Sequence, residues 1–375
     1  MVEYTKHELK DVCKRLSSGK GISSKLIGEK GLYPVYGGNG IRGYTEHSNF
    51  SGDCAIIGRQ GAFCGNVRYF KGEAYMTEHA VVVCADDFNN THYLSYLLST
   101  MNLGRLSGQS AQPGLSVKTL GIQEIMLPPL EYQYKVVALL NSLDEKIAIN
   151  EKINDNLEQQ AQSLFFEYFG RVSRNALPDG WSAATLGDVA VICNKSFNPA
   201  KEPETMLEHY SIPAFDETHF PVFELSTNIK SNKFKVDADC FMISKLNPST
   251  KRVWKPYCLT GKAVCSTEFI VYKAKDQGYT DFLYSLIDSD DFSAFMCSHV
   301  TGSTGSRQRT PSSETLQYSF VMPAREDVAL FSSLVHPMYE QIRVNAIENE
   351  KLKRLRDSLL PKLMSGTVDV SSIQL

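Results

Sequence analysis

The chain lacks the residue patterns by which several large classes of protein are recognised. No apolar run approaches the roughly 20 residues that a membrane span needs, and the first residues, MVEYTKHELK, contain no apolar signal segment. We therefore expect a cytoplasmic protein without membrane contact. The 9 cysteines form no CxxC pair, and the His and Cys residues show no paired spacing. These absences argue against a disulfide framework and against a zinc site.

A dominant charge and catalytic motifs are also missing. The formal net charge is only -3, so any contact with nucleic acid needs cations gathered on one face or supplied by a partner. No Walker A motif, nucleophile elbow, HExxH or acidic metal cluster occurs. A GxGxxG match spans residues 38–43, but the following YTEHSN is not a helix start, which favours a tight turn over a dinucleotide site. We expect no catalysis, no metal and no cofactor in this chain.

What the sequence does contain is a repeat of two long amphipathic helices, expected over Glu131–Phe169 and Glu326–Met364. In both, the apolar positions advance by alternating steps of four and three residues, the period of helices that pair. Both place two successive asparagines at the same point of this seam, about 195 residues apart. The expected seam positions are Leu143, Ile147, Asn150, Asn154 and Leu157 in the first helix, and Met338, Ile342, Asn345, Asn349 and Leu352 in the second.

The two helices are expected to pair with each other as an antiparallel coiled coil. A helix of about 39 residues is roughly 58 Å long at 1.5 Å per residue, too long for one small globe to cover. Antiparallel pairing would bring Asn150 to Asn349 and Asn154 to Asn345, whereas a parallel pair would stack Asn150 on Asn345. The remaining alternative is that each helix packs only on its own globe.

Each helix follows a segment of mixed short strands and turns, so we predict an α+β fold with a pseudo-twofold tandem repeat. The expected divisions are 1–128, a first globular α/β domain; 129–172, a helical spacer; 173–322, a second globular domain; and 323–375, a second helical spacer. Strands are expected at Cys54–Ile57, Ala80–Cys84, Cys240–Ser244 and Thr267–Tyr272, and helices near Asn90–Thr100 and Thr280–Ile287. Pro361 is expected to break the second long helix near its end.

Polar side chains on Gly-rich turns are the candidate binding residues. Basic and amide side chains beside aromatic rings suit phosphate contacts and the reading of base edges, although a solvated surface loop has the same composition. A Gly/Ser/Gln-rich loop precedes both long helices at nearly the same repeat position, which is more informative than either copy alone. The candidates are Tyr36, Asn39, Arg42, Tyr44, Arg59, Gln60, Arg68, Ser110 and Gln112 in the first globe, and Lys245, Asn247, Lys251, Arg252, Trp254, Lys255, Ser306, Arg307, Gln308 and Arg309 in the second.

Several of these segments resemble the specificity subunit of a Type I restriction-modification system. The run GQSAQPGLS at 108–116, followed by IMLPPLE at 125–131 and LDEKI at 143–147, carries the most specific likeness. YPVYGGNGIRGY with GRQG at 58–61 is similar to one common type of target recognition domain. Gly180-Trp181, LGD at 186–188 and TGSTGSRQR are similar to another type.

The resemblance implies two target recognition domains, each reading one half of a split site in double-stranded DNA. The helices would set the gap and dock two methyltransferase subunits, and motor-nuclease subunits would complete the complex. S-adenosylmethionine, ATP and Mg would then belong to those partners. Family members commonly show Glu-Gln where the helix begins, whereas this chain has Glu131-Tyr132-Gln133 and then Glu326-Asp327-Val328. The alternative is a coiled-coil scaffold whose globes bind protein partners.

Overall fold

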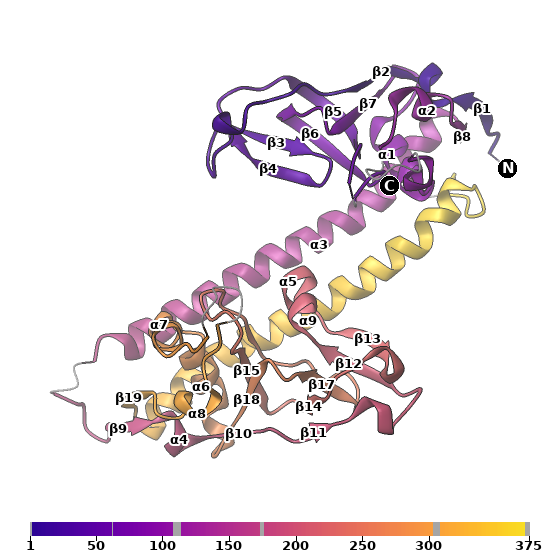
Figure 1. Cartoon of the computed structure of the whole chain (residues 1–375). Helices are drawn as coiled ribbons and strands as arrows, with labels where there is room; N and C mark the ends of the chain where they lie inside the picture. Colours follow the sequence, from indigo (N-terminus) through magenta and orange to yellow (C-terminus); the bar gives the residue numbers. More distant parts are fainter. Residues whose placement is uncertain (1, 62, 108–113, 173–175, 303–307, 372–375) are drawn as a thin grey trace. The chain divides into compact units, whose positions relative to one another are not determined.

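Figure 1 shows the computed structural model of the chain, which describes residues 2–61, 63–107, 114–172, 176–302 and 308–371. Its contacts divide the chain into two compact units. Unit 1 contains Met1–Ile147 and Lys351–Leu375, and unit 2 contains Ala148–Glu350. Each unit therefore combines one globe with a part of both long helices. Among the described residues, no helix is both long and apolar enough to cross a membrane.

Unit 1 is built on a six-stranded sheet in the order β2-β7-β5-β6-β3-β4. A separate antiparallel pair, β1 with β8, precedes the first long helix. The strands are β1 (Thr5–Glu8), β2 (Cys13–Ser18), β3 (Tyr33–Gly37), β4 (Gly40–Thr45), β5 (Phe50–Gly58), β6 (Val67–Met76), β7 (Ala80–Ala85) and β8 (Glu124–Leu127). β5 and β7 contain the expected strands. β4 follows the Gly38–Asn39 turn directly, so the GxGxxG match at 38–43 continues into a strand and not a helix.

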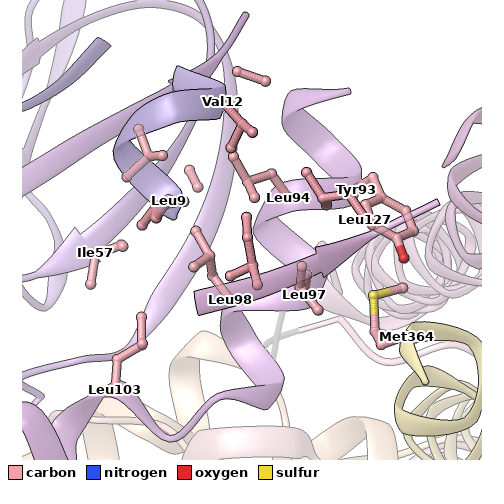
Figure 2. Close-up of a cluster of buried hydrophobic side chains, with 14 of the residues drawn as sticks. Leu9, Val12, Ile57, Tyr93, Leu94, Leu97, Leu98, Leu103, Leu127 and Met364 are labelled. Carbon is pink, nitrogen blue, oxygen red and sulfur yellow. The ribbon is translucent and has the colours of Figure 1, made fainter. Parts of the chain in front are cut away.

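The core of unit 1 lies where α1 (Thr91–Thr100) covers the sheet. Asn90 caps this helix by accepting a hydrogen bond from the Tyr93 N–H at 2.9 Å, and the buried side chains repeat at helical spacing. Figure 2 shows Leu94, Leu97 and Leu98 of α1 packed against Ile57 of β5, with Met364 from the end of the second long helix in the same cluster. The short helices η1 (Leu9–Val12), η2 (Ser24–Leu26), η3 (Leu103–Leu106) and α2 (Val117–Gly121) complete this globe.

Unit 2 contains two larger sheets, β10-β18-β15-β16 and β11-β14-β17-β12-β13, and a β9–β19 pair that precedes the second long helix as β1–β8 precedes the first. The strands are β9 (Ser182–Thr185), β10 (Ala190–Ile192), β11 (Ser196–Phe197), β12 (Met206–Tyr210), β13 (Val222–Leu225), β14 (Lys233–Lys235), β15 (Cys240–Ser244), β16 (Val253–Trp254), β17 (Ala263–Ser266), β18 (Phe269–Ala274) and β19 (Ser319–Met322). The short helices are α4 (Leu186–Val189), η5 (Pro199–Lys201), α5 (Ile212–Thr218), η6 (Ser226–Asn228), η7 (Gln277–Tyr279), α6 (Thr280–Ile287), α7 (Asp290–Ser298) and α8 (Ser312–Thr315). β15 and α6 match their predicted bounds, and β18 begins two residues later than expected.

The long helices are α3 (Leu130–Phe165), followed by a π-helical turn η4 (Phe166–Gly170), and α9 (Arg325–Met364). Within unit 2, Asn150 Nδ2 donates to Asn349 Oδ1 at 2.8 Å, and Asn345 Nδ2 donates to Asn154 Oδ1 at 2.8 Å. These two bonds confirm the antiparallel register that the seam predicts. The other expected seam residues, Leu143, Ile147, Leu157, Met338, Ile342 and Leu352, are buried or half-buried.

One expectation about the helices needs correction. Pro361 does not break α9, which continues to Met364. Pro361 lies in the last turn, where the loss of one backbone N–H costs little of the hydrogen-bond ladder, and its carbonyl still accepts from Ser365 N at 3.0 Å. In addition, the contacts divide the chain after Ile147 and after Glu350, within the helices, rather than at the ends of the globes. This division into units does not test the predicted four segments, which stay a prediction.

Candidate nucleic-acid interface

The turn surface of unit 1 is formed by the β3–β4 turn and the neighbouring side chains of β3, β4 and β6. Asn39 and Arg42 are exposed, and Tyr44 is 37% exposed. Gly40 has a φ of 103°, and a Cβ placed on it would lie 3.2 Å from an Arg68 guanidinium nitrogen. Glycine therefore allows both the turn and the close approach of this exposed arginine.

Tyr36 lies on β3 just before this turn and is half-buried. Its ring packs against Phe70 with a centroid separation of 5.0 Å. Burial raises the pKa of the Tyr36 phenol, and the nearby Arg68 opposes that rise. The tyrosine is therefore a neutral hydroxyl at physiological pH that can donate or accept a hydrogen bond.

The loop after β5 lies beside the same turn. Gly38 approaches Gly58, the Arg59 backbone and the His79 carbonyl. The Arg59 backbone N–H donates to the His79 carbonyl at 2.9 Å. The Arg59 guanidinium donates to the Glu78 carbonyl at 3.5 Å. The Gln60 Oε1 lies 3.0 Å from His79 Nδ1. The structure thus gathers Tyr36, Asn39, Arg42, Tyr44, Arg59, Gln60 and Arg68 on adjoining turns and strands of one globe.

The Gly/Ser/Gln-rich loop that precedes α3 returns to this surface. Its candidates Ser110 and Gln112 lie outside the described residues. Where the chain is described again, the Leu115 N–H donates to the Arg59 carbonyl at 2.8 Å, and Gly114 forms a β-bridge with Gln60. The loop is therefore anchored at its far end to the residues that the sequence had singled out.

The loop surface of unit 2 joins the ends of the two basic segments that the sequence predicts. The Asn247 N–H donates to the Gln308 carbonyl at 2.9 Å, and the Thr310 N–H donates to the Lys245 carbonyl at 3.1 Å. Arg309 forms a bridge with Leu246. Ser306 and Arg307 lie outside the described residues. Lys245, Asn247, Gln308 and Arg309 are thereby brought together although they are about 60 positions apart in the chain.

The two anchoring points occupy equivalent places in the repeat. Gly114 in unit 1 and Arg309 in unit 2 are 195 residues apart, the same separation as Asn150 and Asn345. Each ends a loop that precedes a long helix, and each bridges to a loop of the globe's sheet. The duplication therefore extends from the helices to the way in which the candidate loops are held.

The basic segment from Lys251 to Lys255 differs from the prediction. Lys251 pairs with Asp288 at 3.1 Å, Arg252 with Asp216 at 2.6 Å, and Lys255 with Asp281 at 2.6 Å. Trp254 is only 4% exposed and packs in the core with Tyr210 and Phe269. We therefore withdraw Trp254 as a base contact, and the three cations are neutralised by carboxylates rather than gathered as one free basic string.

The sequence did not point to two residues that belong to these surfaces. His79 contacts Gln60 in unit 1, and Glu268 accepts hydrogen bonds from the Arg309 guanidinium at 2.9 and 3.0 Å in unit 2. No local motif marks either one, because both act through a partner distant in the chain. Within the described ranges, no three His, Cys, Asp or Glu side chains are grouped as a metal site would require.

The fold is similar to that of a solved restriction-modification S subunit. The crystal structure of the Type I restriction-modification S subunit from M. genitalium superposes with a TM-score of 0.66 over 96% of each chain, at 15% sequence identity. Residues 1–159 match the family described as the Type I restriction modification DNA specificity domain.

Two curated specificity subunits are similar to this chain in sequence. The EcoprrI specificity subunit of Escherichia coli is 40% identical over 147 residues, which cover 38% of this chain and 36% of that protein. The MjaIX specificity subunit of Methanocaldococcus jannaschii is 25% identical over 314 residues, covering 76% of this chain and 70% of that subunit. The first of these matches thus spans little more than a third of the relative. Residues 1–159 are thus similar to the Type I restriction modification DNA specificity domain, and longer parts of the chain are similar to curated specificity subunits.

Proposed function

We propose that this chain selects the DNA sequence on which a Type I restriction-modification complex acts. The turn surface of unit 1 reads one half of a split site, and the loop surface of unit 2 reads the other half. The observation that carries the proposal is the pair of equivalent loops, anchored at Gly114 and Arg309, of which the first lies within the matched DNA specificity domain. The chain itself supplies recognition, and its partners supply the chemistry.

The side chains on these surfaces suit contacts to base edges more than a general attraction to the phosphate backbone. Arginine donates bidentately to guanine, and glutamine or asparagine pairs with adenine, each good pair discriminating by about 1–3 kcal/mol. The net charge of -3 leaves little general attraction to phosphate. We infer that a large share of phosphate neutralisation comes from partner subunits, and that binding weakens steeply as salt concentration rises.

The long helices offer apolar side chains for partner docking. Ile149 is 52% exposed and Val344 is 51% exposed, and these residues are equivalent in the repeat. Ile149 and Ile153, with Leu157, also line a shallow groove on α3. Exposed aliphatic residues at matched places suit two copies of one partner, so we propose that two methyltransferase subunits dock here.

Mapping of methyladenine tests the reading of half-sites. The chain is co-expressed with its methyltransferase subunit in a methylation-free host, with Arg42→Ala/Arg68→Ala in unit 1 or Gln308→Ala/Arg309→Ala in unit 2. We expect a split motif with a fixed gap, relaxed in one half by the first variant and in the other half by the second. Loss of one bidentate base contact corresponds to about ten-fold or more in discrimination at that base.

The controls are Lys6→Ala and Lys262→Ala, which remove exposed ion pairs outside both surfaces. Both should leave the motif unchanged. Relaxation of both halves by one variant would contradict the assignment of one half-site to each globe. If the complex assembles but shows no salt-sensitive affinity for DNA, a protein-binding scaffold is favoured instead.

The role of the helices is tested separately by removing one heptad from both. We expect a shorter gap between unchanged half-sites, or loss of activity, because the helices are proposed to set the separation. Altered half-sites with an unchanged gap would refute this role. Docking is tested by native mass spectrometry of Ile149→Glu and Val344→Glu, each expected to remove one methyltransferase subunit, with Leu32→Glu as an exposed control in unit 1.

A further inference from the structure

Unit 2 contains a cavity of about 220 Å³ that neither candidate surface uses. Its walls come from α3, α5, β16 with the loop after it, α6 and α9, and every lining residue lies within Ala148–Glu350. Pockets for drug-sized ligands begin at about 300 Å³, so this cavity fits a group the size of one amino-acid side chain.

Tyrosine rings form a large part of the wall. Tyr257 and Tyr339 are both buried, and Tyr284 meets Tyr339 edge to face with centroids 4.9 Å apart. The faces of such rings carry negative charge and attract cations. One cation already uses this property, because the Lys255 ammonium lies 5.6 Å from the centroid of the Tyr339 ring.

The charges around the cavity leave one carboxyl group without a matching cation. Arg343 pairs with Glu340 at 3.6 Å, and Lys255 pairs with Asp281. Glu158 lines the same cavity, and within the described part of the chain it forms no ion pair or hydrogen bond. Lys251, the one cation that acts on Glu158, is itself bound to Asp288.

We propose that this cavity binds an organic cation, an alkylammonium or guanidinium group the size of a lysine or arginine side chain. Its charge lies against Glu158, and its alkyl or planar part lies against Tyr284 and Tyr339. Aromatic faces combined with a carboxylate are the recurring recognition elements for such cations. A neutral group of the same shape would gain only the apolar contact.

The electrostatics of Glu158 agree with this geometry. Although Glu158 as a whole is exposed, partial desolvation of its carboxyl in the cavity and the neighbouring Asp288 and Asp155 raise its pKa to about 7. A bound cation favours the ionised carboxylate, so the affinity should increase as pH rises through 7. The other charged or titratable groups around the site are Lys251, His219, Lys255, Asp281, Glu340 and Arg343, with the tyrosines 257, 284 and 339. Burial lowers the pKa of His219, so this histidine is neutral above pH 7.

Fluorescence can report binding directly, because the chain has 2 tryptophans and one of them, Trp254, lines the cavity. In a Trp181→Phe variant, Trp254 is the sole reporter during titration with butylguanidinium or its neutral isostere butylurea. We expect saturable binding of butylguanidinium only, about ten-fold tighter at pH 8 than at pH 6, since a group with pKa 7 ionises over this interval. Saturation-transfer NMR on the unmodified chain gives the same comparison if Trp181→Phe does not fold.

Glu158→Gln should abolish both the binding and its pH dependence, whereas Glu151→Gln, on the same helix outside the cavity, should preserve them. Equal binding of butylurea, unchanged binding by Glu158→Gln, or no binding of butylguanidinium at millimolar concentration would overturn the proposal. The same butylguanidinium titration on the complex with the methyltransferase subunit then identifies the source of the natural cation. This second experiment rests on the proposed function. Loss of butylguanidinium binding there identifies a partner side chain as the occupant, and retained binding identifies a free small cation.

Discussion

Replacing Asn150 by leucine tests how the two long helices hold their register. Asn150 is 1% exposed, and its amide donates to Asn349 Oδ1 at 2.8 Å and to Glu348 Oε2 at 2.7 Å. Leucine cannot donate, so the buried Asn349 loses this donor, whereas the half-buried Glu348 can turn toward water. A buried polar group left without its partner costs about 1–3 kcal/mol. We therefore expect about 2 kcal/mol of destabilisation, a decrease of roughly 4–8 °C in Tm for a unit of about 200 residues.

The double variant Asn150→Leu/Asn349→Leu separates the amide bond from simple packing. Two leucines at facing seam positions replace the polar pair by an apolar contact, so the double variant should be more stable than Asn150→Leu alone. Urea unfolding followed by circular dichroism measures the free energy of unfolding for both, with Asn156→Leu on the exposed face of α3 as the matched control. An effect of Asn150→Leu below about 0.5 kcal/mol, the range of ordinary surface changes, would refute the reasoning. Strict additivity of the two substitutions would refute it as well.

Three further predictions concern single side chains. Gln133→Val should destabilise unit 1 by about 1–3 kcal/mol in urea unfolding, because the buried amide contacts Asn90 N, Asn89 Oδ1 and the Pro128 carbonyl; an unchanged midpoint would contradict this. At pH 8, a disulfide reagent should react rapidly with the exposed Cys297 and slowly with Cys54 or Cys240, because burial raises the pKa of these two thiols to about 12. Fast reaction of all 9 cysteines in the folded chain would argue against that burial. The pKa of Glu158 is about 7 in the folded chain, against an ordinary 4.5. The folded state therefore binds the proton more tightly than the unfolded state. This contribution to stability is fully present below pH 4.5 and is lost as pH rises through 7. The stability difference between the chain and Glu158→Gln should therefore change between pH 4.5 and 7, and a difference constant over that range would exclude the raised pKa.

The elements that the sequence predicted well are those whose signal is local and periodic. α3 and α9 match the expected helices within about one turn, because their seam repeats over many turns and both ends are marked. β15 is buried at all of its 5 residues and was found as a short apolar run bounded by turns. The asparagines limited the register within each orientation, since a polar residue in an apolar seam needs a polar partner, but both the parallel and the antiparallel orientation supply one.

The prediction was poorest where side chains meet partners from distant parts of the chain. The basic segment around Trp254 contains no acid of its own, so its composition suggested a surface for phosphate. The three acids that neutralise it, Asp216, Asp281 and Asp288, come from other elements, and the sheet buries the tryptophan. Composition within a window cannot reveal these pairings. The binding role of the candidate loops stays a prediction, and their described ends, Gly114 and Arg309, form bridges at equivalent places in the repeat.

The antiparallel pairing also accounts for the presence of two asparagines in both helices. Asn150 is equivalent in the repeat to Asn345, yet it bonds to Asn349, and Asn154 bonds to Asn345. Each asparagine of one copy is therefore satisfied by the non-equivalent asparagine of the other copy. Replacing a single one removes one of the two amide–amide bonds between the helices, whereas keeping both asparagines in both copies preserves both bonds. The pair of asparagines in each seam thus follows from combining a tandem duplication with antiparallel packing, and a parallel arrangement would have required only one.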